Sequence, residues 1–165
     1  MRQLRLWVFI TVLTSCRCWM QSPTLHYCLE DKNVYVSNVI ITNATLGQHF
    51  GINYTLEFMR RLQKNPRLDL IMSVAGGPQI PCVDNIGSCS YNLCNAETEI
   101  ETRITDPWRN ECPIPRGLLN GYFRHQLSHT AWTVLKGRAV LIRANIIEGG
   151  ELLACFRLTV MIRPF

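Results

Sequence analysis

Apolar and polar residues alternate along much of the chain with a period of two. In residues 52–58, and again in residues 68–74, every second side chain is apolar and most of the residues between them are polar. Alternation of this kind is typical of strands with one buried face. A β-branched run over residues 34–41 predicts a further strand.

Other segments give weaker signals. Residues 98–104 predict another strand, with two isoleucines on one face and two glutamates on the other. Proline and glycine cluster at 76–81 and 113–121, which marks both segments as turns. A single helical turn is expected at 91–96.

The C-terminal third predicts a hairpin. Residues 139–147 and 151–162 flank Gly149 and Gly150, and glycine readily adopts the positive φ that a tight hairpin turn needs. In the second strand Cys155 belongs to the face opposite an apolar stripe made of Leu152, Ala154, Phe156, Leu158, Val160 and Ile162. About seven strands separated by turn residues predict an all-β antiparallel β-sandwich.

The N-terminus has the pattern of a secretory signal over residues 1–18. Arg2 and Arg5 precede an uncharged apolar stretch that is too short to span a bilayer, and Cys18 ends the segment as a small residue before the cut. We therefore expect residues 19–165 to form a single soluble domain that is secreted or lysosomal.

The charge of the chain changes when this segment is removed. The full chain has 17 basic and 12 acidic residues, and three of the basic residues lie in residues 1–18. The remaining charge is close to neutral, so a nucleic-acid partner is not expected. A basic cluster could meet anionic lipid head groups or form a solvated loop; its members are Arg60, Arg61, Lys64 and Arg67.

Cysteines and glycosylation sequons agree with an oxidising route. Six cysteines remain after cleavage, and none of them forms a C-x2-C pair of the kind that zinc sites use. An even number of cysteines predicts disulfides, although counting leaves 15 pairings open. Asn43 and Asn53 each begin an N-x-T sequon and are expected to carry glycans at the surface.

Catalytic chemistry has no clear basis in this sequence. There is no G-x-S-x-G motif, the carboxylates form no compelling pair, and the histidines are scattered. We predict no catalytic residue, no metal site and no cofactor. The apolar strand faces could pack into a solid core or stand apart around a lipid, and periodicity does not separate these two possibilities.

One segment resembles a known family. The run Ile80-Pro81-Cys82-Val83-Asp84-Asn85-Ile86-Gly87-Ser88-Cys89 is similar to the corresponding segment of the ML (lipid-recognition) domain family, most closely of its ganglioside-activator branch. Supporting similarities are Cys28-Leu29-Glu30-Asp31, Cys94, Cys112-Pro113, Trp132 with Gly137, and the closing run Gly150-Glu151-Leu152-Leu153-Ala154-Cys155-Phe156-Arg157-Leu158.

The resemblance implies a β-cup with an apolar lipid cavity, stabilised by disulfides. It implies the pairs Cys28–Cys155, Cys82–Cys89 and Cys94–Cys112. Its function would be non-enzymatic: extracting a ganglioside-like glycolipid during transient contact with a membrane and presenting it to a soluble hydrolase such as a lysosomal glycosidase. The alternative is a secreted lipid-sensing or receptor-binding module of the sterol or lipopolysaccharide type.

Two departures from the family pattern affect the expected membrane contact. Residues 95–111 contain no cysteine, so the fourth disulfide of the ganglioside-activator branch is missing. In that branch a bulky apolar loop with a tryptophan precedes the short-loop cysteine. At the corresponding place this chain has Val74-Ala75-Gly76-Gly77-Pro78. Leu118 and Leu119 could supply the membrane-contact loop instead, or they could tuck beneath it.

The strand faces and the resemblance together predict the residues of the lipid cavity. Trp132 is placed at the rim or in the core. The predicted cavity residues are Ile52, Tyr54, Leu56, Phe58, Leu70, Met72, Trp132, Val140, Ile142, Phe156, Leu158 and Val160.

Overall fold

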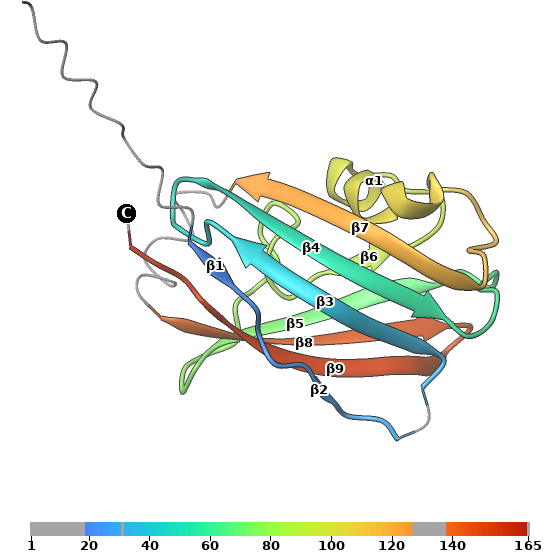
Figure 1. Ribbon diagram of the computed structural model, residues 1–165, viewed down its shortest axis with the longest axis horizontal. Coiled ribbons are helices and arrows are strands. Elements are labelled where there is room, and N and C mark those ends of the chain that lie inside the picture. Colours follow the sequence, from blue (N-terminus) through green and yellow to red (C-terminus); the bar gives the residue numbers. More distant parts are fainter. Residues whose placement is uncertain (1–18, 31, 127–137, 165) are drawn as a thin grey trace, which may run out of the picture.

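Two antiparallel sheets face each other in this protein (Figure 1). A computed structural model describes residues 19–30, 32–126 and 138–164. The first sheet has the strand order β1-β3-β4-β7 and contains β1 (Met20–Gln21), β3 (Val34–Thr42), β4 (His49–Phe58) and β7 (Gly117–Gln126). The second has the order β2-β9-β8-β5-β6 and contains β2 (His26–Tyr27), β5 (Arg67–Val74), β6 (Ser90–Asn92), β8 (Ala139–Glu148) and β9 (Glu151–Met161). The predicted antiparallel β-sandwich is confirmed.

Strand register decides which side chains face the space between the sheets. In β4, Ile52 pairs with Ile41 of β3 on one side and with Phe123 of β7 on the other. Directly paired residues point to the same face of an antiparallel sheet, so these three side chains lie together on the inner face. The intervening residues of β4, such as Asn53, face outward.

The β8–β9 hairpin turns at the predicted glycines but contains an unexpected bulge. Gly149 and Gly150 adopt positive φ values of 57° and 88°. The register shifts after Ile146, which leaves one extra residue in β9. Because of this shift Leu153 is fully buried and Leu152 is 37% exposed, so the expected placement of Leu152 on the inner stripe is wrong. Cys155 lies on the face of β9 opposite Phe156, as expected, and it has no exposed surface because a disulfide joins it to the N-terminal segment.

The predicted strand over 98–104 is wrong, because this segment forms the helix α1 (Glu99–Thr105). The side chain of Thr98 accepts a hydrogen bond from the Glu101 N–H at 3.2 Å, and the Glu101 side chain accepts one from the Thr98 N–H at 3.0 Å. This reciprocal arrangement is a capping box. Ile100 and Ile104 are four residues apart, so in a helix they share a face and point inward, as a strand would also have allowed.

Glu101 also fixes this helix to the second sheet. Its carboxylate accepts a hydrogen bond from the backbone N–H of Asn92 in β6 at 2.7 Å. Burial acts to raise the pKa of Glu101, but the backbone hydrogen bonds outweigh it and hold the pKa below its usual value. Figure 1 shows α1 lying beside β7, and the 3-10 helix η1 (Asp106–Trp108) follows it directly.

Two further local predictions are wrong. The helical turn expected at 91–96 is instead the end of β6 followed by a bend. The turn segment expected at 113–121 ends at Gly117, where β7 begins. In both places pairing with a neighbouring strand (β5 for β6, and β4 for β7) satisfies the backbone, and in β7 it overrides the local preference of glycine for turns.

The connections after β4 and η1 close one end of the sandwich. Leu62 and Ile114 exchange backbone hydrogen bonds of 3.1 and 2.8 Å, and both side chains are fully buried. Trp108 is 5% exposed and donates its indole N–H to the Leu93 carbonyl at 2.8 Å. Around them packs a cluster that includes Val34, Phe58, Ile146, Leu153 and Ala154.

Glu148 at the β8–β9 turn binds the segment that follows β4. Its carboxylate accepts hydrogen bonds from the backbone N–H groups of Gln63 and Lys64 and pairs with the Arg60 guanidinium. Burial acts to raise the pKa of Glu148, but these contacts outweigh it and lower the pKa. Arg60 of the predicted basic cluster therefore has a structural role at this turn.

Three disulfides connect segments of the described chain: Cys28–Cys155, Cys82–Cys89 and Cys94–Cys112. The first spans 127 residues of sequence and attaches the N-terminal segment to β9. The second closes a short loop after β5, and the third ties β6 to the segment before β7. No helix in the described ranges has the length and apolar character needed to cross a bilayer.

Candidate functional site

A cavity of about 370 Å³ lies between the two sheets. Its walls come from the inner faces of β4, β5, β8 and β9, and alternate residues of each strand reach it, as a period of two requires. Branched and aromatic side chains dominate these walls. Ala144, at the middle of β8, is the smallest side chain among those that β8 and β9 contribute to the wall, where the strands supply Val140, Ile142, Ala144, Ile146, Phe156, Leu158 and Val160.

The structure brings together the residues that the sequence predicts for the cavity. Trp132 lies outside the described residues. All the others line the space, with four from β4, two from β5 and five from β8 and β9: Ile52, Tyr54, Leu56, Phe58, Leu70, Met72, Val140, Ile142, Phe156, Leu158 and Val160.

Several lining residues were missed by sequence reasoning. Ile100, Ile104 and Trp108 reach the cavity from α1 and η1, and the helical spacing of the two isoleucines was the signal that could have revealed them. Phe123 and His125 reach it from β7, in a segment whose alternation is interrupted by Gly121. These residues give the cavity a wall that the two predicted strand faces do not supply.

Leu118 and Leu119 do not form the expected apolar loop. Both lie in β7, where successive side chains point to opposite faces. Leu118 is 62% exposed on the outer face, whereas Leu119 packs against the buried cluster around Trp108. A paired leucine patch in a turn is therefore absent from this strand.

The loop between Cys82 and Cys89 borders the opening of the cavity. Among the described lining residues, those exposed to solvent are Pro81, Val83 and Asn85, all in or next to this loop. Asp84 and Asn85 adopt positive φ values of 51° and 58° at its tip. Asn and Asp tolerate this conformation better than most other residues, so a tight turn forms there.

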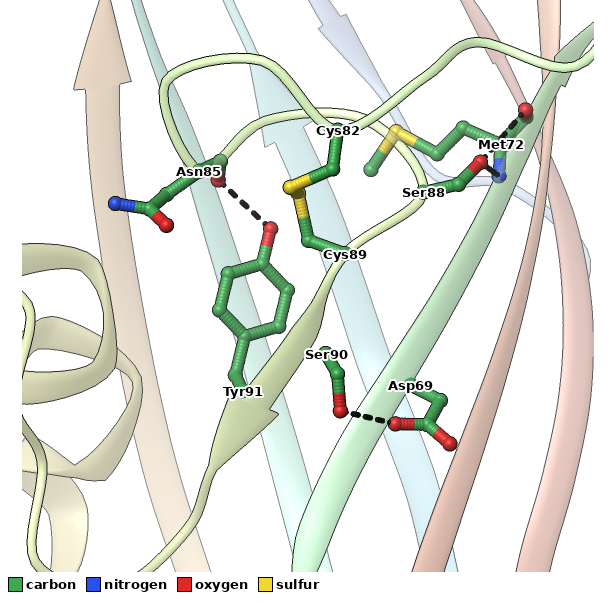
Figure 2. Close-up of a disulfide and its surroundings, with 8 residues drawn as sticks. All are labelled: Asp69, Met72, Cys82, Asn85, Ser88, Cys89, Ser90 and Tyr91. Atoms are coloured by element: carbon green, nitrogen blue, oxygen red, sulfur yellow. Dashed lines mark hydrogen bonds between the residues drawn. A yellow bond between two sulfur atoms is a disulfide. The ribbon is translucent and has the colours of Figure 1, made fainter.

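Hydrogen bonds from Tyr91 and Ser88 fix this loop to the second sheet (Figure 2). The Tyr91 hydroxyl donates to the Asn85 carbonyl at 2.8 Å, and the Ser88 hydroxyl donates to the Met72 carbonyl at 3.2 Å. Gly87 has a φ of 110°, and a Cβ there would lie 2.1 Å from the Pro81 carbonyl oxygen. Glycine is therefore required at this position, and the loop holds its place beside the cavity.

Most polar groups in the cavity wall have hydrogen-bond partners. The Tyr54 hydroxyl donates to the Ile104 carbonyl at 3.4 Å, and burial, aided by Asp106, raises its pKa to about 12. Burial, aided by Glu101, likewise raises the pKa of Tyr91 to about 12. Both tyrosines are therefore neutral and act as hydrogen-bond donors at physiological pH.

His125 is the exception within the described residues. Its Nδ1 is buried and has no hydrogen-bond partner there. The ring stacks on Phe123 and meets Phe50 edge-on, with centroid distances of 6.1 and 6.4 Å. Burial lowers the pKa of His125, repulsion from Arg103 and His49 adds to this, and Glu99 acts in the opposite direction. The imidazole therefore favours its neutral form in the wall.

The arrangement is suited to holding apolar matter. Neutral polar groups paired within the protein offer no acid and base at one reacting point. Within the described ranges no three His, Cys, Asp or Glu side chains are grouped closely enough to hold a metal ion. The chemistry that the cavity offers is removal of hydrocarbon from water.

The two sequon asparagines lie on the first sheet and at its edge. Asn53 is exposed on the outer face of β4. Asn43 follows β3, is partly exposed, and donates its backbone N–H to the Trp19 carbonyl at 2.8 Å. Both side chains are outside the cavity lining.

Comparison with solved structures finds a similar fold. A Niemann-Pick type C2 protein from Japanese carpenter ant superposes with a TM-score of 0.51 at 7% identity, over 84% of this chain and 98% of that chain. The C-terminal domain of wzt gives a TM-score of 0.48 at 10% identity, over 87% of this chain and 78% of that chain. No family model and no curated protein matches the sequence. The chain thus shares the two-sheet fold of a Niemann-Pick type C2 protein, and nothing in the comparisons singles out the ganglioside-activator branch.

Proposed function

We propose that this protein is a non-enzymatic lipid carrier that holds a hydrocarbon chain or ring system between its two sheets. The observation that carries the proposal is the cavity of about 370 Å³ with walls of branched and aromatic side chains. Each CH2 group taken from water into such a space gains about 0.8 kcal/mol. A long chain is therefore retained by apolar contact without any catalytic group.

The size of the cavity bears on the kind of lipid. Ligand pockets commonly occupy about 300–1,000 Å³, so a cavity of about 370 Å³ is near the lower end of that range. One hydrocarbon tail or one sterol-sized body fits this space more readily than two tails do. A ganglioside-like lipid would leave its sugar head, and part of its second tail, at the opening beside Val83 and Asn85.

In the full proposal the protein extracts a ganglioside-like glycolipid during brief contact with a membrane. It then presents the head group to a soluble hydrolase, such as a lysosomal glycosidase. The three disulfides support a secreted or lysosomal location, because disulfides persist in oxidising compartments. A secreted lipid-sensing or receptor-binding module that holds a sterol or a lipopolysaccharide tail is the second candidate, and the modest cavity volume favours it.

A blocking substitution tests the cavity. Ala144 lines the cavity and is 2% exposed, so Ala144→Trp would fill the space with an indole ring. Leu141→Trp is the matched control, because Leu141 is in the same strand but 43% exposed. We expect lipid co-purifying with the secreted protein, measured by extraction and mass spectrometry, to fall about tenfold or more in Ala144→Trp and to persist in Leu141→Trp.

Transfer assays separate the two candidates. Vesicles containing a ganglioside and vesicles containing a sterol are offered to the wild-type protein, and the lipid extracted into solution is measured. Preferential extraction of ganglioside supports the glycolipid carrier, and preferential extraction of sterol supports the alternative. Full lipid loading in a folded Ala144→Trp variant would show that the cavity is not the binding site.

A further inference from the structure

The outer face of the first sheet presents an asparagine between two exposed apolar side chains. Asn53 in β4 pairs with Ile40 of β3 on one side and with Tyr122 of β7 on the other. Paired residues share a face, so all three side chains project from the outer surface. Ile40 is 37% exposed and Tyr122, in the edge strand β7, is 54% exposed.

Gly51, the neighbour of Asn53 on this face of β4, leaves room for the Tyr122 ring. A Cβ added at Gly51 would meet the Tyr122 hydroxyl at 3.0 Å and the Tyr122 ring carbon Cε2 at 3.1 Å. The ring therefore lies across the backbone of Gly51, where the missing side chain leaves room for it. One side of the ring packs on the sheet, the rest of the side chain is exposed, and Tyr122 is the register partner of Asn53.

The threonine of the sequon that begins at Asn53 is inaccessible in the folded sheet. Thr55 is 6% exposed, its hydroxyl donates to Asn120 Oδ1 at 2.9 Å, and it accepts a hydrogen bond from Asn38 Nδ2 at 3.3 Å. A transferase that must reach both Asn53 and Thr55 would find them accessible only before β4 pairs with its neighbours. A glycan at Asn53 would thus be present when the sheet assembles.

We propose that an N-linked glycan on Asn53 covers this face, with its first sugar packed against the exposed side of Tyr122 and against Ile40. A pyranose ring has a face of C–H groups, and the face of an aromatic ring carries the negative part of its quadrupole, so the two attract. The glycan also removes two apolar side chains from contact with other molecules. This role is independent of what the cavity binds.

Asn43 provides a matched comparison within the same chain. It follows β3 with a φ of 53° and lies opposite no exposed aromatic residue in the sheet register. A glycan at Asn43 would project from the edge of the sandwich into solvent. Only the Asn53 glycan is therefore expected to be coupled energetically to Tyr122.

The test uses the full chain secreted from eukaryotic cells. Mass spectrometry of peptides before and after enzymatic deglycosylation gives the occupancy of Asn53 and Asn43. Thermal unfolding is then compared for the wild type, Asn53→Gln, Tyr122→Leu and the double variant. Leucine at position 122 keeps an apolar side chain at this exposed position but lacks an aromatic face, and because Tyr122 is 54% exposed we expect the variant to fold.

We expect Asn53 to be occupied and Asn53→Gln to lower Tm by about 2–4 °C in the wild-type background. The same change should have a much smaller effect in the Tyr122→Leu background, and Asn43→Gln should cause equal shifts in both backgrounds. In NMR spectra of the wild-type glycoprotein, protons of the first sugar should be shifted upfield by the Tyr122 ring.

Four results would overturn this role. The first is an unoccupied Asn53 in the secreted protein. The second is an equal loss of Tm from Asn53→Gln in both backgrounds, and the third is sugar proton shifts that Tyr122→Leu leaves unchanged. Self-association of the fully glycosylated protein through Tyr122 would likewise contradict it, since a second copy would then be the occupant of this face.

Discussion

The two ends of the space between the sheets are built from similar strand faces, yet one end is filled and the other is hollow. At the filled end Leu62 and Ile114 are fully buried, and Trp108 is 5% exposed. Toward the other end several inward residues that border the cavity are only partly buried; they include Phe50, Ile52, Met72, Ile142 and Phe156. Alternation along the strands is the same in both regions.

The difference comes from the connections and not from the strands. After β4 the chain passes Leu62 between the sheets and pairs it with Ile114, and η1 adds Trp108. At the hollow end the connection between β5 and β6 is closed by Cys82–Cys89, and it is tied to β6 through Tyr91 and to β5 through Ser88. It borders the space without entering it. A loop that inserts large side chains makes a core, and a loop fixed at the rim leaves a cavity.

The largest expected effect is a loss of stability at the filled end. Trp108→Ala removes a buried aromatic ring and its hydrogen bond to Leu93, and we expect a decrease of about 3–5 kcal/mol in the free energy of unfolding, measured by urea denaturation. Ile142→Ala at the hollow end should cost about 1–2 kcal/mol, because part of that side chain faces empty space and loses few contacts.

Equal losses for these two truncations would contradict the comparison. The assay also distinguishes the ends in a second way. A bound lipid should restore much of the stability of Ile142→Ala, since the ligand fills the space that the truncation enlarges. The same lipid should restore a smaller share of the stability lost in Trp108→Ala, because it does not replace the hydrogen bond to the Leu93 carbonyl.

A smaller loss of stability is expected at Gly121, where the absence of a side chain leaves room for the Tyr54 ring in the cavity wall. A Cβ at Gly121 in β7 would lie 2.2 Å from the Tyr54 ring, so Gly121→Ala must push this ring toward the cavity. We expect a loss of about 1–3 kcal/mol, the usual range for overpacking, together with weaker binding of a fluorescent lipid. Adding Tyr54→Leu should recover part of both losses. An unchanged Tm in Gly121→Ala would show that the Tyr54 ring can move away from residue 121 without loss of stability.

The strands and the inner stripes could be predicted from the sequence, because a period of two is a direct consequence of strand geometry. Ile52, Leu70, Ile142 and Phe156 therefore reach the cavity as their positions predict. The presence of a cavity between the sheets could not be predicted from this alternation. It depends on whether residues such as Leu62 and Ile114, far apart in sequence, meet between the sheets.

The wrong predictions have two causes, a local helix signal in one segment and strand pairing in the others. Residues 98–104 alternate well enough for a strand, but Thr98 and Glu101 form a capping box that starts a helix. Leu153 exchanges places with Leu152 because of a bulge that no residue type announces. The cluster of proline and glycine over 113–121 predicts a turn at Leu118 and Leu119, whereas pairing with β4 makes them part of a strand.

The smallest expected effect is a dependence of lipid retention on pH at the hollow end. The neutral ring of His125 lies in the cavity wall, and burial, followed by repulsion from Arg103 and His49, lowers its pKa below the ordinary value of 6.5. Glu99 opposes this only in part. The closed wall therefore has its full stability above pH 6.5 and loses it as the pH falls from that value toward the lowered pKa, because the opened or unfolded state binds the proton more tightly.

Retention of a fluorescent fatty acid should thus decrease when the pH is lowered from 7 to 5. His125→Phe preserves a ring between Phe50 and Phe123 but cannot be protonated, so the decrease should be smaller in that variant. His26→Gln is the matched control, since His26 is exposed in β2 and is not part of the cavity lining. If His125→Phe and His26→Gln lose the lipid with the same pH profile as the wild type, the acid sensitivity belongs to the ligand or to another group, and the wall at His125 is as indifferent to pH as the filled end.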